Sequence, residues 1–293
     1  MTSKISEAFT RRAFLAGAGA VVLTAACGKE SGSSSKPDDE REGAGAGAQD
    51  LIGIVASADL YMGATNRFAF GVVRGDSLVR GGDVRVGFAP DGTKPRALSS
   101  ATFHGDGLPE DKGVFVATAD FDQPGIWQAV VELEGKRATL NFQVSAQPKV
   151  PAPGGAAPRA AAPTVTDTLG VDPICTRVPA CPLHTVALDT AIGGGEPVAV
   201  MFSTPARCTS RVCGPVLELL LGMAPSYEGR IAFSHVEIFN SAESTDLVPT
   251  LGAWGLDTEP WLFGIKGDGT IAARLDGAFD APEVKALLDS LVV

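Results

Sequence analysis

Two cysteines, Cys208 and Cys213, have a spacing that fits thiol chemistry, with four residues between them in the stretch PARCTSRVCGPVLELL. On a regular helix, positions five apart differ by ~7.5 Å of rise and ~140° of rotation, whereas a disulfide needs Cα atoms roughly 4.4 to 6.8 Å apart. We therefore expect Cys208 to lie in a loop. Pro215 fits the first position of a helix, so both sulfurs should lie at or just before a helix N-terminus.

A dithiol in that position can exchange with other disulfides. The helix dipole, with Arg207 and Arg211 nearby, favours the thiolate and lowers the thiol pKa, and the thiolate is the form that attacks a disulfide. Two other uses of Cys208 and Cys213 stay open. One is a structural disulfide, although closing so short a loop stabilises a fold only modestly, and the other is a metal site.

A second pair of cysteines, Cys175 and Cys181, lies in the stretch DPICTRVPACPLH. Pro179 and Pro182 stiffen this loop, and we expect a structural disulfide here. The alternative is electron relay, in which this pair exchanges with the first one.

Metal binding is the rival chemistry for these residues. His184 follows Cys181 by three positions, His235 lies in the middle of an expected strand, and thiolates with imidazoles suit copper. We nevertheless expect each histidine to be an ordinary surface or core side chain, and we predict no metal. No organic cofactor is predicted either, because GAGAGA at 43–48 lacks the strand and helix of a nucleotide-binding fingerprint.

Residues 1–27 have the layout of an export signal. Their apolar run of about fourteen residues is shorter than the roughly 20 that a membrane-spanning helix needs. The segment TRRAFL, with Arg11 and Arg12, resembles a twin-arginine signal, and LTAAC resembles a lipobox, with Thr24 and not leucine three places before the cysteine. These resemblances imply export and a diacylated Cys27 that anchors the protein at the extracytoplasmic face of a bacterial membrane.

Cysteine number supports this interpretation. The chain has five cysteines, which is odd for an exported protein, but a lipid on Cys27 leaves four, enough for two disulfides in an oxidising compartment. Of the three possible pairings, we favour the local one, within 175/181 and within 208/213.

The charge of the chain excludes one class of partner. The net charge is −10, and removal of residues 1–26, which hold three basic and one acidic side chain, leaves 21 basic against 33 acidic residues, or −12. An acidic surface without a basic stripe disfavours nucleic acid. Anionic lipid head groups repel it as well, so membrane contact should come from the lipid on Cys27 alone.

Two low-complexity segments divide the chain. Residues 28–50 are expected to form a disordered tether and residues 147–167 a Pro/Ala-rich linker, in which 147–163 would be a semi-rigid spacer of up to ~50 Å if extended. Residues 51–146 alternate apolar and polar side chains between turn signals, which predicts an all-β sandwich of immunoglobulin-like type. We expect this domain to be a spacer or partner-binding module, with His104 in a solvated loop.

Residues 168–293 alternate between strand and helix patterns. Val198–Phe202 is a continuous apolar run, as in a strand buried on both faces, and a helix at 215–223 and a strand at 231–239 follow it. A short helix at 245–251, a hairpin of 261–266 with 270–275 and a closing helix that begins at Asp280 complete the pattern. This order predicts a small mixed sheet with a parallel βαβ unit covered by helices.

The C-terminal part resembles the thioredoxin superfamily. The matching features are the buried strand that leads to the cysteines (VAVMFSTPARCTSRVCGP), the strand entered through Thr258-Glu259-Pro260-Trp261, and the tail LFGIKGDGTIAARLDGAFDAPEVKALLDSLV. The resemblance implies an α/β thioredoxin-like fold, Cys208 as nucleophile, Cys213 as resolving cysteine and Pro260 as a cis-proline that faces the dithiol. The spacing departs from the family, because thioredoxins have two residues between their cysteines.

These observations together predict a membrane-anchored, extracytoplasmic thiol-disulfide oxidoreductase of thioredoxin type. Its partners would be exported proteins with thiols or disulfides, and we expect a monomer. The alternatives are a copper-binding chaperone similar to the Sco type, whose members use a cysteine pair and a distant histidine, and a catalytically inactive binding module.

Overall fold

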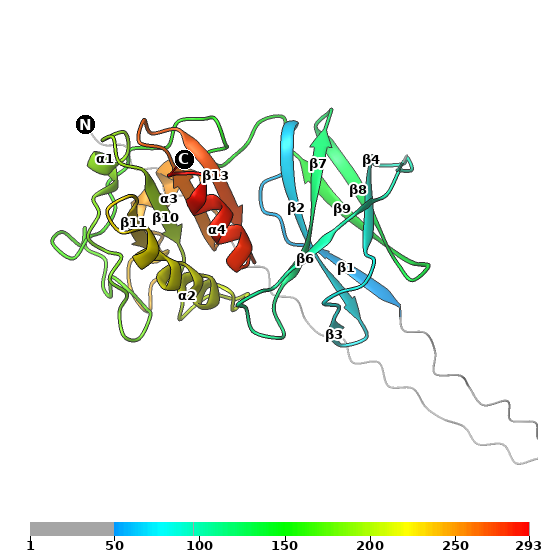
Figure 1. Cartoon of the computed structure of the whole chain (residues 1–293), viewed down its shortest axis with the longest axis horizontal. Helices are drawn as coiled ribbons and strands as arrows, with labels where there is room; N and C mark the ends of the chain where they lie inside the picture. The colour runs from blue at the N-terminus through cyan, green and yellow to red at the C-terminus, as the bar shows by residue number, and fades with distance from the viewer. Residues whose placement is uncertain (1–49, 96, 293) are drawn as a thin grey trace, which may run out of the picture. The chain divides into compact units, whose positions relative to one another are not determined.

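The computed structural model describes residues 50–292 apart from residue 96, and all of these belong to one compact unit (Figure 1). The predicted export signal, with Arg11 and Arg12, the predicted lipidation at Cys27 and nearly all of the tether lie outside the described residues. Within the described part of the chain, no helix is long and apolar enough to cross a membrane.

Residues 51–146 form what we call the sandwich lobe, which is built from antiparallel strands in two sheets. One sheet has the order β1-β2-β7-β6, with β3 paired to β2, and the other has the order β5-β4-β8-β9. The strands are β1 (Leu51–Val55), β2 (Gly63–Arg74), β3 (Ser77–Leu78), β4 (Arg85–Pro90), β5 (Ser99–Ser100), β6 (Thr102–His104), β7 (Val114–Phe121), β8 (Gly125–Leu133) and β9 (Lys136–Val144).

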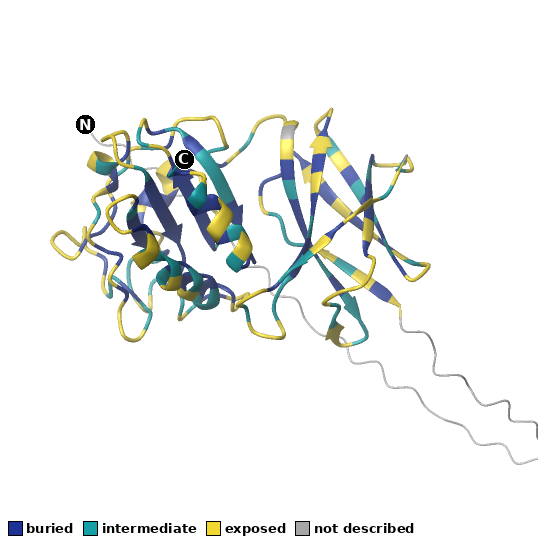
Figure 2. Cartoon of the chain, in the orientation of Figure 1, coloured by how far each residue is buried: buried dark blue, intermediate teal, exposed yellow. Residues whose placement is uncertain are grey.

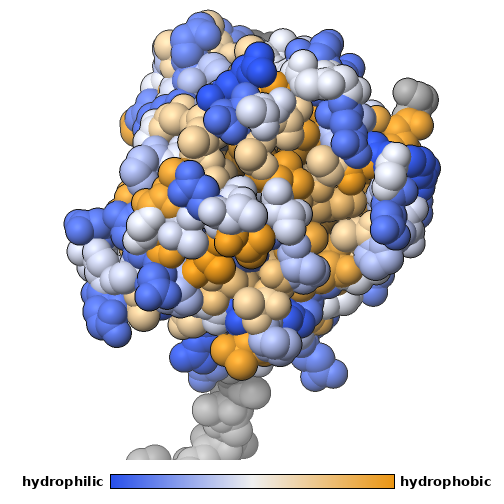
Figure 3. Space-filling view, turned by 90° about the vertical axis from the view of Figure 1, so that its left-hand side faces the viewer, coloured by the Kyte–Doolittle hydropathy of each residue, from blue (hydrophilic) through white to orange (hydrophobic). Residues whose placement is uncertain are grey.

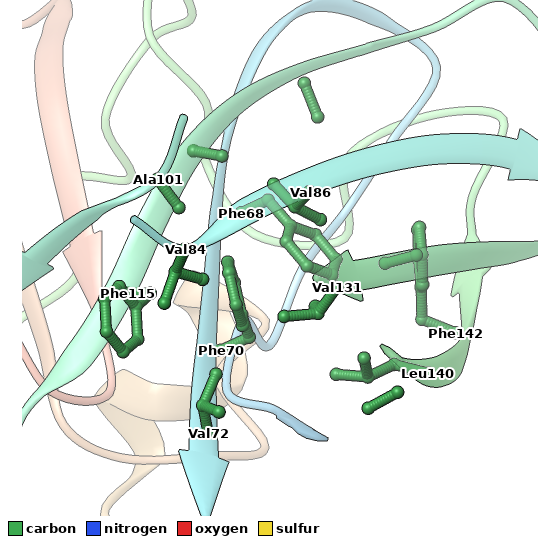
Figure 4. Close-up of a cluster of buried hydrophobic side chains, with 14 of the residues drawn as sticks. Phe68, Phe70, Val72, Val84, Val86, Ala101, Phe115, Val131, Leu140 and Phe142 are labelled. Carbon is green, nitrogen blue, oxygen red and sulfur yellow. The ribbon is translucent and has the colours of Figure 1, made fainter. Parts of the chain in front are cut away.

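Alternation of apolar side chains builds the core of this lobe. Phe68, Phe70 and Val72 are fully buried on β2, because residues two apart on a strand point to the same face. They meet side chains from the second sheet, and the rings of Phe68 and Phe142 have their centroids 4.9 Å apart (Figure 4). The expected strand-rich, sandwich-like character of residues 51–146 is therefore confirmed.

Residues 147–292 form the C-terminal lobe, around a four-stranded sheet of order β11-β10-β12-β13. Strand β10 pairs with β11 in parallel and with β12 antiparallel. Both β10 and β12 are buried along their whole length (Figure 2). The elements are α1 (Leu188–Ala191), β10 (Val198–Phe202), α2 (Cys213–Met223), the 3-10 helix η1 (Ala224–Tyr227), β11 (Ala232–Val236), α3 (Pro249–Trp254), β12 (Trp261–Ile265), β13 (Ile271–Asp276) and α4 (Ala281–Asp289).

The predicted α/β thioredoxin-like fold is wrong. Strands hold 35% and helices only 14% of the structure, in three antiparallel or mixed sheets. The helices α2 and α4 pack on one face of the C-terminal sheet, but the other face is covered mainly by irregular chain and by the very short α1 and α3. An α/β fold needs helices that cover its sheet, and this sequence covers one face with loop residues instead.

The Pro/Ala-rich segment supplies part of that irregular cover and is no extended spacer. Val150, Ala157 and Ala162 are buried in the same cluster as the strands of the sheet. The amide of Ile271 on β13 donates to the carbonyl of Gly155 at 2.8 Å, and the amide of Ala157 donates to Gly269 at 2.9 Å. The small alanines allow this close approach, so the segment belongs to the C-terminal lobe.

Helix α4 begins where the sequence predicts. Asp280 is its N-cap, its side chain accepts from the amide of Glu283, and the Glu283 side chain returns a bond to the Asp280 amide, which completes a capping box. The same carboxylates contact two side chains of the sandwich lobe. Arg67 Nε lies 2.7 Å from Glu283 Oε1, and His104 Nδ1 lies 3.1 Å from Asp280 Oδ1. His104 is therefore a half-buried contact residue and not the solvated loop residue expected.

Candidate functional site

A disulfide joins Cys208 and Cys213 at the start of α2, with Cα atoms 6.0 Å apart. Cys213 is the first residue of the helix. Cys208 lies in the turn before it, where its amide donates to the carbonyl of Thr204 at 3.1 Å and its carbonyl accepts from Arg211 at 3.1 Å. The predicted pairing and the predicted loop position of Cys208 are both confirmed.

The two sulfurs differ in their surroundings. Cys213 is completely buried, whereas Cys208 keeps 9% of its surface exposed. Cys208 Sγ lies 3.4 Å from the amide nitrogen of Cys213, in the first turn of α2, and 3.2 Å from Ser210 Oγ. Of the two, Cys208 is thus the less buried residue, and an N–H and a hydroxyl are available to stabilise negative charge on its sulfur.

The two arginines near the pair are placed differently from the sequence expectation. The guanidinium of Arg207 donates to the carbonyls of Ser241 and Ser244 at 3.1 and 2.5 Å and stacks 4.0 Å above the ring of Phe239. Arg207 therefore fixes the cysteine loop to residues 239–244, and Arg211 is exposed. The polar groups within hydrogen-bond distance of Cys208 Sγ are instead the Cys213 amide and the Ser210 hydroxyl.

Glu259 is a site residue that sequence analysis missed. Its Oε2 lies 3.4 Å from Cys213 Sγ and accepts the amide of Thr204 at 2.7 Å. Burial raises the pKa of Glu259 to about 7, with the nearby Glu237 carboxylate adding to the effect, while the Thr204 N–H and Arg207 oppose it. The only sequence signal was its place directly before Pro260, in a segment quoted for its proline.

Pro260 follows a cis peptide bond from Glu259, as predicted. Its carbonyl accepts the amide of Gly277 at 3.0 Å, which ties the entrance of β12 to the end of β13. Glu259 also lines a pocket of about 460 Å³ together with Ser210, Val212 and Thr258. A small thiol or the extended chain of a partner therefore has a route to the carboxylate and to the cysteine loop.

The expected disulfide between Cys175 and Cys181 is not formed, because both cysteines are free. They lie in a buried cluster with His184 and His235, in which the candidate ligand atoms are all within 4.8 Å of one another. Cys181 donates its thiol hydrogen to Cys175, which lowers the pKa of Cys175 and raises that of Cys181, and both imidazoles contribute to the lowering. The two histidines are core residues, as one of the two expectations had it, and their ring nitrogens lie next to the cysteine sulfurs.

The comparisons with known proteins leave the family of the chain open. No protein-family model matches it, and no curated protein matches it. Among solved structures, a structure of titin M4 in a trigonal form matches 34% of this chain and 98% of its own, with 12% identity and a TM-score of 0.20. These comparisons give no support to the thioredoxin resemblance.

Proposed function

We propose that this protein is a thiol-disulfide oxidoreductase whose working pair is Cys208 and Cys213. The observation that carries the proposal is the Glu259 carboxyl group, 3.4 Å from Cys213 Sγ and with a pKa of about 7. A half-buried acid of that pKa next to a thiol can take up and return a proton near neutral pH. A disulfide that served only to hold the loop would gain nothing from such a group.

The proposed exchange uses the two sulfurs in order. In the reduced protein, the Cys208 thiolate attacks one sulfur of a partner disulfide, and the partner's other sulfur leaves as a thiolate. Glu259 then takes the proton of the Cys213 thiol, and the Cys213 sulfur attacks Cys208 Sγ. The bond between Cys208 and the partner breaks, so the partner leaves as a dithiol and this protein keeps a disulfide, with two electrons transferred.

Exported proteins with thiols or disulfides are the partners that we propose, outside the cytoplasmic membrane and with the lipid on Cys27 as anchor. Large apolar side chains are available for such contacts, since Val165, Leu169, Val178 and Leu247 of the C-terminal lobe are exposed. Figure 3 shows one face of the structure, on which apolar side chains gather between polar ones. Exposed apolar side chains that gather on one face are typical of contact sites.

The test is the reduction potential of the Cys208–Cys213 pair, measured in glutathione buffers with each disulfide mapped by mass spectrometry. We expect a value within the range of known exchangers, about −120 to −270 mV. A value below about −300 mV, the range of structural disulfides, would refute the proposal.

Variants separate the roles of the two sulfurs. Cys208→Ser should abolish turnover of a disulfide substrate while the circular dichroism spectrum stays unchanged. Cys213→Ser should instead trap a mixed disulfide, because the resolving thiol is missing. Thr209→Ala, an exposed change in the same loop, serves as the matched control. Equal turnover by Cys208→Ser and the control would contradict the assignment of the nucleophile.

A further inference from the structure

Four buried side chains of two kinds meet on the sheet of the C-terminal lobe, and they lie outside the proposed redox pair. Cys175, Cys181 and His184 come from the loop that precedes α1, and His235 comes from β11. Their exposed fractions are 6%, 5%, 2% and 0%. Cysteine thiolates and imidazoles in a set of two and two are the ligands of closed tetrahedral metal sites.

The distances inside this cluster, which we call the Cys2His2 cluster, fit such a site. Cys181 Sγ lies 3.3 Å from His184 Nε2 and 3.3 Å from His235 Nδ1, and Cys175 Sγ lies 3.8 Å from His235 Nδ1. Metal–sulfur and metal–nitrogen bonds of about 2.3 and 2.0 to 2.1 Å at a tetrahedral angle place the two ligand atoms about 3.6 Å apart. The three sulfur-to-nitrogen contacts are therefore close to the edge length of such a tetrahedron.

His235 is oriented as a metal ligand by groups behind it. Its Nε2 lies 3.0 Å from the carbonyl oxygen of Ser203 and 3.0 Å from Ser203 Oγ. A carbonyl oxygen can only accept, so the ring proton sits on Nε2, and the lone pair on Nδ1 points to the sulfurs. Metal-bound histidines are held in the same way, with the second ring nitrogen donating to a carbonyl or carboxylate.

The remaining ligands are held by the backbone and by the cluster itself. The amide of His235 donates to the carbonyl of Leu183 at 2.7 Å, which fixes the loop to β11 next to His184. The amide of Cys181 donates to Cys175 Sγ at 3.4 Å. His184 Nδ1 is buried without a hydrogen-bond partner among the described residues, so the contact of Nε2 with Cys181 is the polar contact that holds this ring.

Charge argues for a cation at the centre of the cluster. Ligation of a metal ion removes the protons of both thiols, and the ion supplies the counter-charge without which two buried thiolates are strongly unfavourable. The guanidinium of Arg177, in the same loop, is engaged elsewhere, since it donates to Glu218 at 2.6 and 3.1 Å. A disulfide between Cys175 and Cys181 would remove the charges but would leave two buried imidazoles facing uncharged sulfur.

We propose that Cys175, Cys181, His184 and His235 bind a thiophilic metal ion, Zn²⁺ or Cu⁺, in a closed tetrahedral site. Both ions accept thiolate and imidazole ligands. All four positions are filled by the protein, so the role is structural: the ion fixes the irregular loop of residues 171–187 to β11. The two proposals can be tested separately, because none of the four ligands is a residue of the proposed redox pair or its base.

The test uses the full chain, reduced under anaerobic conditions and loaded separately with Zn²⁺ and Cu⁺. After gel filtration, we expect one metal ion per chain by elemental mass spectrometry. Cys181→Ser and His235→Gln should weaken metal binding by about 100-fold or more, because loss of a ligand costs more than loss of a residue that only hydrogen-bonds to a ligand. His104→Gln and the double variant Cys208→Ser/Cys213→Ser should retain the ion, which separates this proposal from the redox one.

A second measurement needs no variant and so does not depend on the folding of one. Co²⁺ added to the reduced wild-type protein should give the absorption of a tetrahedral site with sulfur-to-cobalt charge transfer, and bound Zn²⁺ should slow alkylation of Cys175 and Cys181. Absence of the charge-transfer band in protein with both thiols confirmed free would overturn the proposal. Metal retained by the Cys181 and His235 variants but lost in the Cys208/Cys213 double variant would overturn it as well.

Discussion

Replacement of Glu259 by glutamine tests the core of the redox proposal. Glu259→Gln keeps the shape of the side chain, and its oxygen can still accept the Thr204 amide, but the group no longer titrates. In the wild-type protein the pKa is about 7, against an ordinary value of 4.5. The folded state therefore holds a proton between about pH 4.5 and 7 that the unfolded state has released, and the free energy of unfolding must fall as pH rises through this window.

The size of the effect follows from the same two values. A change from 4.5 to about 7 corresponds to at most about 3 kcal/mol, and partial exposure of Glu259 to solvent reduces it to about 1 to 2 kcal/mol. Below pH 4.5 the carboxyl is neutral in both states and costs nothing. Above pH 7 the carboxylate is ionised in the folded state, and the free energy of unfolding is lowered by the full amount.

Urea unfolding of the oxidised protein at pH 5 and pH 8 measures this difference. Fluorescence can report it, because Trp254 and Trp261 are buried in the C-terminal lobe. We expect Glu259→Gln to lose about 1 to 2 kcal/mol of the decrease seen in the wild-type protein, and the exposed change Glu228→Gln to leave the decrease intact. Equal pH dependence in wild type and Glu259→Gln would refute a perturbed carboxyl at this position.

The same variant should alter kinetics. Release of a thiol from a mixed disulfide on Cys208 should accelerate as pH rises through about 7 in the wild-type protein, because the ionised carboxylate is the base for Cys213. A positioned general base contributes typically about 10²- to 10⁴-fold. Glu259→Gln should lower the rate at pH 7.5 by about 10²-fold and lose the inflection, and an unchanged profile would assign the base to another group.

Two further predictions concern the elements around the site. Asp280→Ala removes the N-cap of α4 together with the contact to His104 and should lower the free energy of unfolding by at least about 1 kcal/mol. An unchanged midpoint in urea unfolding would mean that neither contact contributes. The methyl group of Gly222→Ala, near the end of α2, meets open space, and this variant should stabilise the protein by about 0.5 to 1 kcal/mol. The methyl group of Gly267→Ala would clash with the Gly195 carbonyl, so this variant should destabilise the protein. Shifts of equal sign in the thermal unfolding temperature would contradict the packing described.

Elements with a strong local pattern could be predicted from the sequence. The run Val198–Phe202 forms β10 with the predicted bounds, because five consecutive apolar residues bounded by turn residues suit a strand buried on both faces. Asp280 and Glu283 define the start of α4 through the two hydrogen bonds of a capping box, and Pro282 favours it through its fixed φ angle. Each of these signals acts between residues a few positions apart, which is why the sequence alone reveals it.

The fold class could not be predicted in the same way, because it depends on what covers each face of a sheet. The segment 147–167 has no apolar periodicity, and its composition indicates a solvated linker. It packs against the sheet through isolated side chains such as Val150 and Ala157, whose burial depends on the shape of the strands opposite. The same limit hid Glu259, which meets Cys213 across 46 positions, and the approach of Cys181 to His235 across 54.

The Cys2His2 cluster and the proposed redox site both contact the chain directly after β10. Ser203 receives the Nε2 proton of His235 on its carbonyl oxygen, and the amide of the next residue, Thr204, donates to Glu259. Both residues are completely buried, and one peptide unit joins them, so a displacement of His235 moves the donor that fixes Glu259 beside Cys213. A filled Cys2His2 cluster would therefore stiffen the backbone that sets the position, and with it the pKa, of the proposed base.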